Sequence, residues 1–163
     1  MNLDQTLSEE NKMEAGKIRE PLYLDDLAVG DVFVSDRYLL TAEEIIRFAG
    51  QFDPQPFHID PEAAKDTFFQ GLAASGWHTA ALTMKLLVTS FPLGRGVIGA
   101  GGEISWPQAT RPGDELKVTS TLLEIKPSRS KPDRGMVLVQ SITTNQRDEV
   151  LQKLTSKVLC FRK

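Results

Sequence analysis

The sequence predicts an α+β protein in which an antiparallel β-sheet wraps around one long helix. The stretch from Gly76 to Phe91 carries apolar residues around almost its whole circumference, so a helix formed by it must be buried. After Gly94, turn sequences separate four β-like runs, at 97–106, 115–125, 135–145 and 150–161. Sequential strands with short connections predict an antiparallel meander, and the buried helix ahead of them predicts a sheet curled around that helix.

The composition is that of one ordinary globular domain. The chain has 163 residues, of which 40% are hydrophobic and 25% charged, and these values exclude collagen-like, coiled-coil and wholly disordered proteins. The net charge is −3 and no basic stripe is present, so we expect no nucleic-acid partner. No apolar run reaches the ~18 residues of a membrane-spanning helix, so we expect no membrane partner.

The ends of the chain suggest a domain boundary and a cellular compartment. Residues 1–20 are polar, charged and aperiodic, which predicts a flexible N-terminal arm before a single domain at 21–163. Alternatively, the arm packs on a partner subunit. The single cysteine, Cys160, cannot close an internal disulfide, and no Cys and His pairs have zinc-ligand spacing. Because no export signal is visible either, we expect a cytoplasmic protein without a metal site.

The segments ahead of the long helix predict one strand and two short helices. A strand is predicted at 31–40, where β-branched and aromatic residues partly alternate with polar ones. Thr41 and Glu44 have capping-box spacing and predict the first helix. Asp60, which is followed by proline, predicts the cap of the second. Between the two helices, the prolines of the run FDPQPFHID (52–60) predict a stiff, non-helical loop.

Two groups that can share a water molecule lie on this loop. Asp53 and His58 place a carboxylate and an imidazole on one rigid segment, which lowers the entropic cost of holding both at a fixed separation. An imidazole titrates near neutral pH and can exchange a proton while the carboxylate takes one from water. This pattern indicates hydration or hydrolysis. The alternative is that Asp53 only starts a turn and His58 has no chemical role.

The start of the long helix is a second candidate position. Unpaired N–H groups and the positive end of the helix dipole meet there, so the N–H of Gly76 can hold a developing oxyanion. The alternative is that Gly76 permits close packing because it has no Cβ. Ser75 is interpreted as the helix cap, since it lies outside any GxSxG motif of a nucleophile. His78, within the apolar helix, is interpreted as a satisfied core histidine.

A match to a dinucleotide-binding motif does not predict a cofactor. Gly94, Gly96 and Gly99 have GxGxxG spacing, but that motif binds a pyrophosphate only where a strand runs into a helix. Here a helix is predicted before the glycines and a strand after them. We therefore expect no nucleotide cofactor, and we interpret the glycines as allowing a strand to bend or to approach the helix.

Two segments resemble the MaoC-like acyl dehydratase family, which includes the (R)-specific enoyl-CoA hydratases. They are FAGQFDPQPFHID (48–60) and GLAASGWHT (71–79), and the resemblance extends over most of the chain after Leu22. The hydratase motif of the family is Asp-x-Asn-Pro-x-His with an acidic residue two positions later. The matching residues here are Asp53, Pro56, His58 and Asp60.

The resemblance implies a fold, an assembly and a reaction. The fold is the hot-dog fold, and the assembly is a homodimer or higher homo-oligomer with the site near the subunit boundary. The reaction is reversible hydration of a 2-enoyl-CoA thioester to a 3-hydroxyacyl-CoA, without a metal or redox cofactor. Carried over by position, Asp53 and His58 share activation of the water and delivery of the proton to C2. The amide of Gly76 stabilises the enolate-like thioester oxygen.

Three further residues are predicted to bind substrate. Gln55 stands where many family members have Asn, Ser75 precedes Gly76, and Phe57 precedes His58. Apolar side chains near the motif suit either an acyl-binding wall or the core. These residues are Phe57, Phe68, Phe69, Leu72, Trp77 and Leu82.

Two other functions stay open on the sequence alone. An acidic group, a water and a helix-end amide also suit hydrolysis of an acyl-CoA thioester on the same architecture. The third possibility is a non-catalytic acyl-CoA-binding protein, in which the loop only shapes a ligand pocket or a subunit contact.

Overall fold

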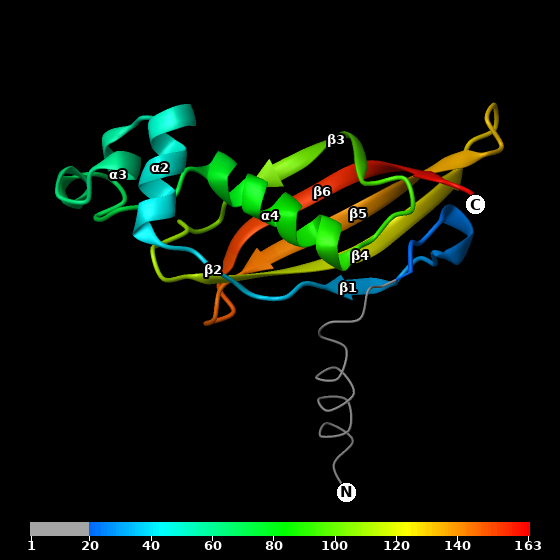
Figure 1. Cartoon of the computed structure of the whole chain (residues 1–163), viewed down its shortest axis with the longest axis horizontal. Coiled ribbons are helices and arrows are strands. Elements are labelled where there is room, and N and C mark those ends of the chain that lie inside the picture. Colours follow the sequence, from blue (N-terminus) through cyan, green and yellow to red (C-terminus); the bar gives the residue numbers. More distant parts are fainter. Residues whose placement is uncertain (1–19) are drawn as a thin grey trace, which may run out of the picture.

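A six-stranded antiparallel sheet carries one long helix across it in the computed structural model (Figure 1). The structure describes residues 20–163, so the predicted arm at 1–20 lies, except for Glu20, outside the described residues. The elements in chain order are η1 (Leu24–Asp26), β1 (Val32–Val34), β2 (Tyr38–Leu39), α2 (Ala42–Phe52), α3 (Pro56–Ile59), η2 (Ala63–Asp66), α4 (Gly76–Ser90), β3 (Ile98–Ser105), β4 (Glu115–Pro127), β5 (Arg134–Thr144) and β6 (Val150–Phe161). The predicted α+β class is confirmed.

The strand order is β1-β4-β5-β6-β3, and β2 also pairs with β4. Strands β4, β5 and β6 form the predicted meander. The prediction is wrong for β3, which pairs with β6 and not with the next strand along the chain. The reason is the segment 106–114, which carries the chain past the beginning of α4 before β4 starts. There the N–H of Ala74 donates to the carbonyl of Thr110 at 2.9 Å.

Helix α4 has one buried face and one exposed face. Leu82 and Leu87, on the buried face, are 7% and 1% exposed. On the opposite face Trp77, Met84 and Val88 expose 62%, 42% and 43% of their surface. The prediction of a helix buried on every side is therefore wrong for the single chain, because the sheet covers α4 from one side only.

The predicted strand at 31–40 is broken into β1 and β2 by an irregular segment. Ser35, between the two strands, donates its N–H to the carbonyl of Val118 at 2.9 Å. Its Oγ accepts the N–H of Val118, also at 2.9 Å. A side-chain oxygen thus takes the place of a backbone carbonyl in the ladder, and the two short strands pair with separate parts of β4.

Short helices fill the segment between β2 and α4. Thr41 and Glu44 form the predicted capping box of α2. The loop predicted at 52–60 instead contains the single-turn helix α3. That prediction fails because Pro56 occupies the first helical position, where its missing N–H has no consequence. Beyond α3, Oδ1 of Asp60 accepts two backbone N–H groups, at 2.9 and 3.1 Å, ahead of η2.

Candidate active site

Two consecutive helices bring Asp53 and His58 face to face. Asp53 ends α2, where its N–H donates to the carbonyl of Ala49 at 2.9 Å. His58 lies in α3, and its N–H donates to the carbonyl of Gln55 at 2.9 Å. Oδ2 of Asp53 lies 3.3 Å from Nε2 of His58. The two side chains are therefore within reach of one shared water molecule.

The carboxylate of Asp53 accepts hydrogen bonds from two neighbours. The Ser75 hydroxyl donates to Oδ2 at 2.7 Å, and Nε2 of Gln55 donates to Oδ1 at 2.6 Å. Burial acts to raise the pKa of Asp53, but these two hydrogen bonds and the charge of a protonated His58 outweigh it and keep that pKa below its usual value. The site thus stabilises Asp53 as the ionised form that can accept a proton.

The imidazole of His58 is held from its other side by the backbone. Its side chain is 6% exposed, and Nδ1 lies 2.6 Å from the carbonyl oxygen of Ala73. Because a carbonyl only accepts, Nδ1 carries a proton and Nε2 is the nitrogen that faces Asp53. The rings of Phe57 and Phe69 have centroids 4.5 and 6.0 Å from the imidazole. The ring is therefore fixed with Nε2 directed to the carboxylate.

The first turn of α4 completes the arrangement. Ser75, fully buried, accepts the N–H of Trp77 at 3.3 Å as the predicted cap while donating to Asp53. Gly76 is the first residue of α4, so its N–H has no acceptor inside the helix. A Cβ on Gly76 would lie 2.7 Å from the ring of Trp106. Gly76 is thus required for close packing, and its amide remains a candidate donor.

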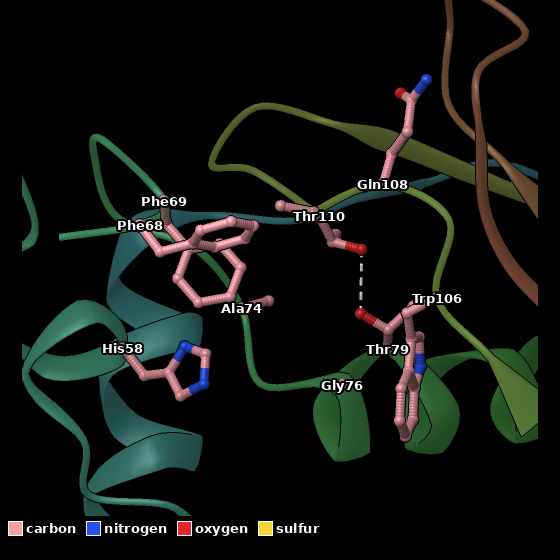
Figure 2. A pocket seen from close by; sticks show the side chains of 10 residues that line it. His58, Phe68, Phe69, Ala74, Gly76, Thr79, Trp106, Gln108 and Thr110 are labelled. Atoms are coloured by element: carbon pink, nitrogen blue, oxygen red, sulfur yellow. Dashed lines mark hydrogen bonds between the residues drawn. The ribbon is translucent and has the colours of Figure 1, made fainter.

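A cavity of about 270 Å³ opens between His58 and Trp106 (Figure 2). Of the predicted site residues, His58 and Gly76 line it. The other four are absent from this described lining: Asp53, Gln55, Phe57 and Ser75. Asp53 and Phe57 contact His58, while Gln55 is exposed and bonded to Asp53. The cavity therefore reaches one member of the Asp53 and His58 pair directly.

The predicted acyl-wall residues lie in different places, some in the cavity, some in the core and one on the exposed face of α4. Phe68 and Phe69 line the cavity, and Phe68 is 93% exposed. Leu72 and Leu82 belong to a buried cluster beside β4 and are absent from the cavity lining. Trp77 is exposed on the outer face of α4. Two of the residues that suited either role from the sequence are therefore placed in the core.

The segment 106–110 supplies cavity residues that the sequence analysis did not identify. Trp106, Gln108, Ala109 and Thr110 line the cavity together with Thr79 of α4, whose hydroxyl donates to that of Thr110 at 2.9 Å. In the sequence, Trp106 ends a predicted β-like run, and residues 107–110 have no predicted role. The one available signal is a tryptophan directly before a proline at a strand end, and it does not indicate which distant residues lie opposite.

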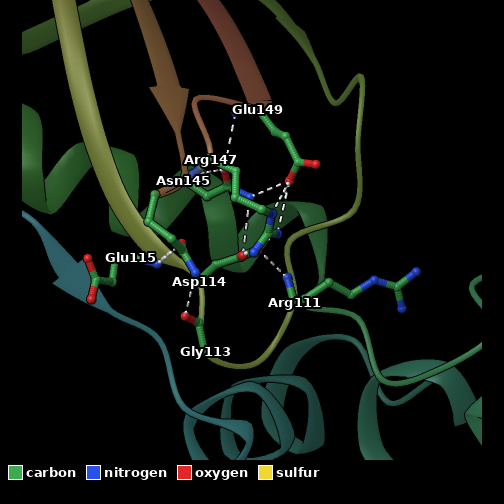
Figure 3. Close-up of polar contacts among 8 residues, drawn as sticks. Arg111, Gly113, Asp114, Glu115, Asn145, Arg147 and Glu149 are labelled. Atoms are coloured by element: carbon green, nitrogen blue, oxygen red, sulfur yellow. Dashed lines mark hydrogen bonds and ion pairs between the residues drawn. The ribbon is translucent and has the colours of Figure 1, made fainter.

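The segment is anchored to the sheet by Asp114, which is 2% exposed (Figure 3). Its carboxylate accepts the N–H of Arg111 at 2.8 Å, Nδ2 of Asn145 at 3.2 Å and Nη2 of Arg147 at 3.3 Å. Glu149 in turn accepts from Asn145 and Arg147, at 2.7 and 3.0 Å. This network joins the start of β4 to the turn between β5 and β6, so it holds the cavity segment on a rigid base.

Other site types are not found in the part of the chain that the structure describes. Within residues 20–163 no three His, Cys, Asp or Glu side chains are grouped to hold a metal ion, and no helix there is long and apolar enough to cross a membrane. His78 stacks on Phe48 with ring centroids 4.4 Å apart, and burial lowers the pKa of its imidazole. Its buried location agrees with the interpretation as a core histidine, but its Nδ1 has no hydrogen-bond partner among the described residues, so the expectation of a satisfied core histidine is wrong.

Comparison with known proteins decides the family. A family model described as the MaoC like domain matches residues 28–145. The chain belongs to the MaoC-like dehydratase family. The resemblance seen at 48–60 and 71–79 is thereby confirmed.

Three similar proteins show how closely this MaoC-like chain matches known sequences and structures. The uncharacterized protein YdeM of Bacillus subtilis (strain 168) is 34% identical over 128 residues, which cover 77% of this chain and 89% of YdeM. A MaoC-like dehydratase from Rhodospirillum rubrum is 62% identical, with a TM-score of 0.86 over 87% of this chain and 98% of that one. An R-hydratase from Pseudomonas aeruginosa is 22% identical, with a TM-score of 0.72 and 88% of each chain covered. The predicted hot-dog fold is confirmed.

Proposed function

We propose that this protein is a hydro-lyase that reversibly hydrates 2-enoyl-CoA thioesters to 3-hydroxyacyl-CoA. The observation that carries the proposal is the 3.3 Å approach of Oδ2 of Asp53 to Nε2 of His58, beside a cavity that Gly76 also lines. Family membership and the similarity to the Rhodospirillum rubrum dehydratase support addition or removal of water as the reaction type.

The two side chains divide the proton transfers. A water held between Asp53 and His58 gives a proton to the pair as its oxygen bonds to C3 of the substrate. The electron pair of the double bond moves to the thioester oxygen, which accepts the N–H of Gly76. The proton passes from Oδ2 of Asp53 to the lone pair of Nε2 of His58, and Nε2 delivers it to C2, so both groups return to their starting states. One water is added and no other reagent is consumed.

The three residues predicted to bind substrate have different roles in this proposal. Gln55 is exposed beside Asp53, so its amide can contact the thioester and orient the carboxylate at the same time. Ser75 is fully buried and acts through Asp53. Phe57 supports the rings of His58 and Phe69, at 4.5 and 4.9 Å between centroids.

The test is a panel of 2-enoyl-CoA and 3-hydroxyacyl-CoA substrates of different acyl length. Hydration removes the ultraviolet absorbance of the enoyl thioester. Asp53→Asn is expected to lose about 10²–10⁴-fold in kcat because a neutral amide cannot accept the water proton. The control is Asp66→Asn, at an exposed aspartate of η2, which should retain full activity. Full activity in Asp53→Asn, or no turnover of any substrate by the wild type, would contradict the proposal.

Thioester hydrolysis and simple binding are separated in the same experiment. Hydrolysis releases free CoA thiol, which a thiol reagent detects, whereas hydration releases none. The protein adds little background, because Cys160 is buried and burial raises the pKa of its thiol to about 11. Saturable binding of acyl-CoA without either product would identify a non-catalytic binding protein.

We also propose that the working unit is a homodimer or a higher homo-oligomer. Trp77, Met84 and Val88 form an exposed apolar stripe at helical spacing on α4. In the described sheet, β3 has β6 as its one neighbour, and Ile98 on that edge strand is 43% exposed. A second copy would cover both features. Light scattering should give at least twice the chain mass, and Met84→Lys should lower it.

A further inference from the structure

Arg111 binds the backbone of a loop next to the candidate site. Its guanidinium donates to three carbonyls, those of Phe69 at 2.5 Å, Gly71 at 3.0 Å and Leu72 at 3.3 Å. The guanidinium spreads its donors over separate nitrogens in a rigid plane, whereas the three donors of a lysine ammonium share one nitrogen. One side chain therefore fixes most of this segment, which we call the 69–72 loop.

The 69–72 loop directly precedes Ala73, whose carbonyl orients His58. Ala73 follows the loop, and its oxygen lies 2.6 Å from Nδ1 of His58, while its N–H donates to the carbonyl of Phe57 at 3.0 Å. Within the loop, Gln70 has a φ of 53°, in the left-handed region that non-glycine residues rarely adopt. The shape of such a turn depends on the hydrogen bonds that hold it, and Arg111 supplies three of them.

Arg111 is itself held on a rigid base. Its N–H donates to Oδ2 of Asp114 at 2.8 Å, inside the network that ties β4 to the β5–β6 turn. The side chain of Arg111 leaves this network and points away from Asp114 (Figure 3). The backbone of Arg111 is thus fixed to the sheet while its guanidinium holds the 69–72 loop. Arg111 therefore connects the loop that precedes Ala73 to the sheet.

We propose that Arg111 is a positioning residue for the reaction, which keeps the proton of His58 on Nδ1 by holding the Ala73 carbonyl in place. This inference rests on the proposed function. With the proton on Nδ1, a neutral His58 presents the lone pair of Nε2 to the shared water, since the carboxylate of Asp53 only accepts and has no proton to donate to it. Without Arg111 the loop relaxes and the Nδ1 hydrogen bond weakens. The tautomer with its proton on Nε2 is then populated, and it cannot take a proton at that atom.

The kinetic test compares Arg111→Met and Arg111→Lys with the wild type. We expect Arg111→Met to lose about 10- to 100-fold in kcat with little change in KM, because a displaced group affects the transition state more than binding. Arg111→Lys should lie between the two, since one ammonium replaces only part of the fork. The matched control is Arg129→Met, at an exposed arginine between β4 and β5, which should keep the wild-type kcat.

Nitrogen NMR of the imidazoles separates positioning from a general loss of stability. The chain has two histidines, so His58→Gln assigns the His58 signals. At a pH where His58 is neutral, the wild type should show the proton on Nδ1 and Arg111→Met a mixture of tautomers. If Arg111→Met does not fold, Arg111→Lys takes its place. A partial transfer of the His58 proton from Nδ1 to Nε2 in that variant supports the proposal.

The proposal for Arg111 is overturned if the Arg111 variants keep the wild-type tautomer of His58 or keep the wild-type kcat. The NMR signal requires no turnover. If the wild type hydrates no enoyl-CoA, the proposed function fails, and the tautomer measurement still decides whether Arg111 orients His58.

Discussion

The two ends of α4, of which the beginning lies on the side of α2 and α3 (Figure 1), are held by different kinds of contact. At its beginning, buried polar groups bind one another: Ser75 and His58 are 0% and 5% exposed, and both approach Asp53. At its end, Phe91 is fully buried and packs on Phe33 with ring centroids 4.6 Å apart. Apolar burial stabilises a fold, whereas buried hydrogen bonds contribute little net stability and are costly mainly when one partner is lost. The far end is therefore held by apolar packing, and the near end holds the candidate chemistry.

A buried polar chain lies between the two ends. Oγ1 of Thr83 lies 2.7 Å from Oγ1 of Thr143 and accepts Nε2 of Gln152 at 3.0 Å, while Oε1 of Gln152 accepts Nε1 of Trp106 at 2.9 Å. The apolar core is accordingly divided into one cluster near the site and another near Phe91. These four side chains connect the cavity wall to the middle of the sheet.

The largest expected effect is at the polar end. Asp53→Asn and His58→Ala should each lower kcat by about 10²–10⁴-fold, because each removes one of the two groups that hold the water in the proposed mechanism. The double variant should be little worse than the poorer single variant, since groups that act as a unit are not additive. Fully multiplied losses in steady-state kinetics would show that the two residues act in separate steps.

The second prediction concerns the apolar end. Phe91→Ala should lower the free energy of unfolding by about 3–5 kcal/mol, through lost burial and the cavity left beside Phe33. Urea unfolding measures this loss. At a temperature where the variant is folded, its kcat should match the wild type. A large loss of kcat in folded Phe91→Ala would break the division between the two ends.

The fold was predictable where local pattern determines structure. Strands β4, β5 and β6, the Ser75 cap and the capping box of Thr41 and Glu44 follow from alternation and hydrogen bonding between near neighbours. The place of β3 beside β6 was not predictable in this way, because the crossing at 106–114 depends on contacts with the start of α4. A side-chain acceptor such as Ser35 also leaves no periodic signal.

The residues of the candidate site were likewise predictable only where the sequence gives a local pattern. Asp53 and His58 were found because they are five positions apart on one proline-containing segment, where sequence spacing limits separation. Trp106 and Arg111 were missed because their partners are distant in sequence, Gln152 for one and the 69–72 loop for the other. Long-range pairing of single side chains has no local pattern.

The third prediction tests the polar chain between the two ends. Gln152→Leu leaves Nε1 of Trp106 and Oγ1 of Thr83 without this partner, and should cost about 1–3 kcal/mol in the free energy of unfolding. In a Trp77→Phe background Trp106 is the single tryptophan, so its fluorescence reports the changed surroundings. Gln140→Leu, at a partly exposed site on β5, is the control and should change neither. Unaltered fluorescence and stability in Gln152→Leu would show that the chain does not hold the cavity wall.

The smallest expected effect is that of Ser75→Ala, which touches both the helix cap and the carboxylate. Loss of the cap should cost about 0.5–2 kcal/mol in the free energy of unfolding. The hydroxyl of Ser75 lowers the pKa of Asp53, so its removal raises that pKa in the folded state.

The sign of the pH effect follows from that shift. A depressed folded pKa contributes stability above the unfolded pKa of the carboxyl, and this contribution is lost as the pH falls through the folded value. At neutral pH, Ser75→Ala should lose part of the stability that the depressed pKa of Asp53 contributes. As the pH falls, its stability should therefore decrease less steeply than that of the wild type. Because the proposed mechanism requires Asp53 as a carboxylate, the acidic limb of the kcat/KM profile should move to higher pH. A limb that stays in place would mean that Asp53 is not the group whose ionisation controls the rate.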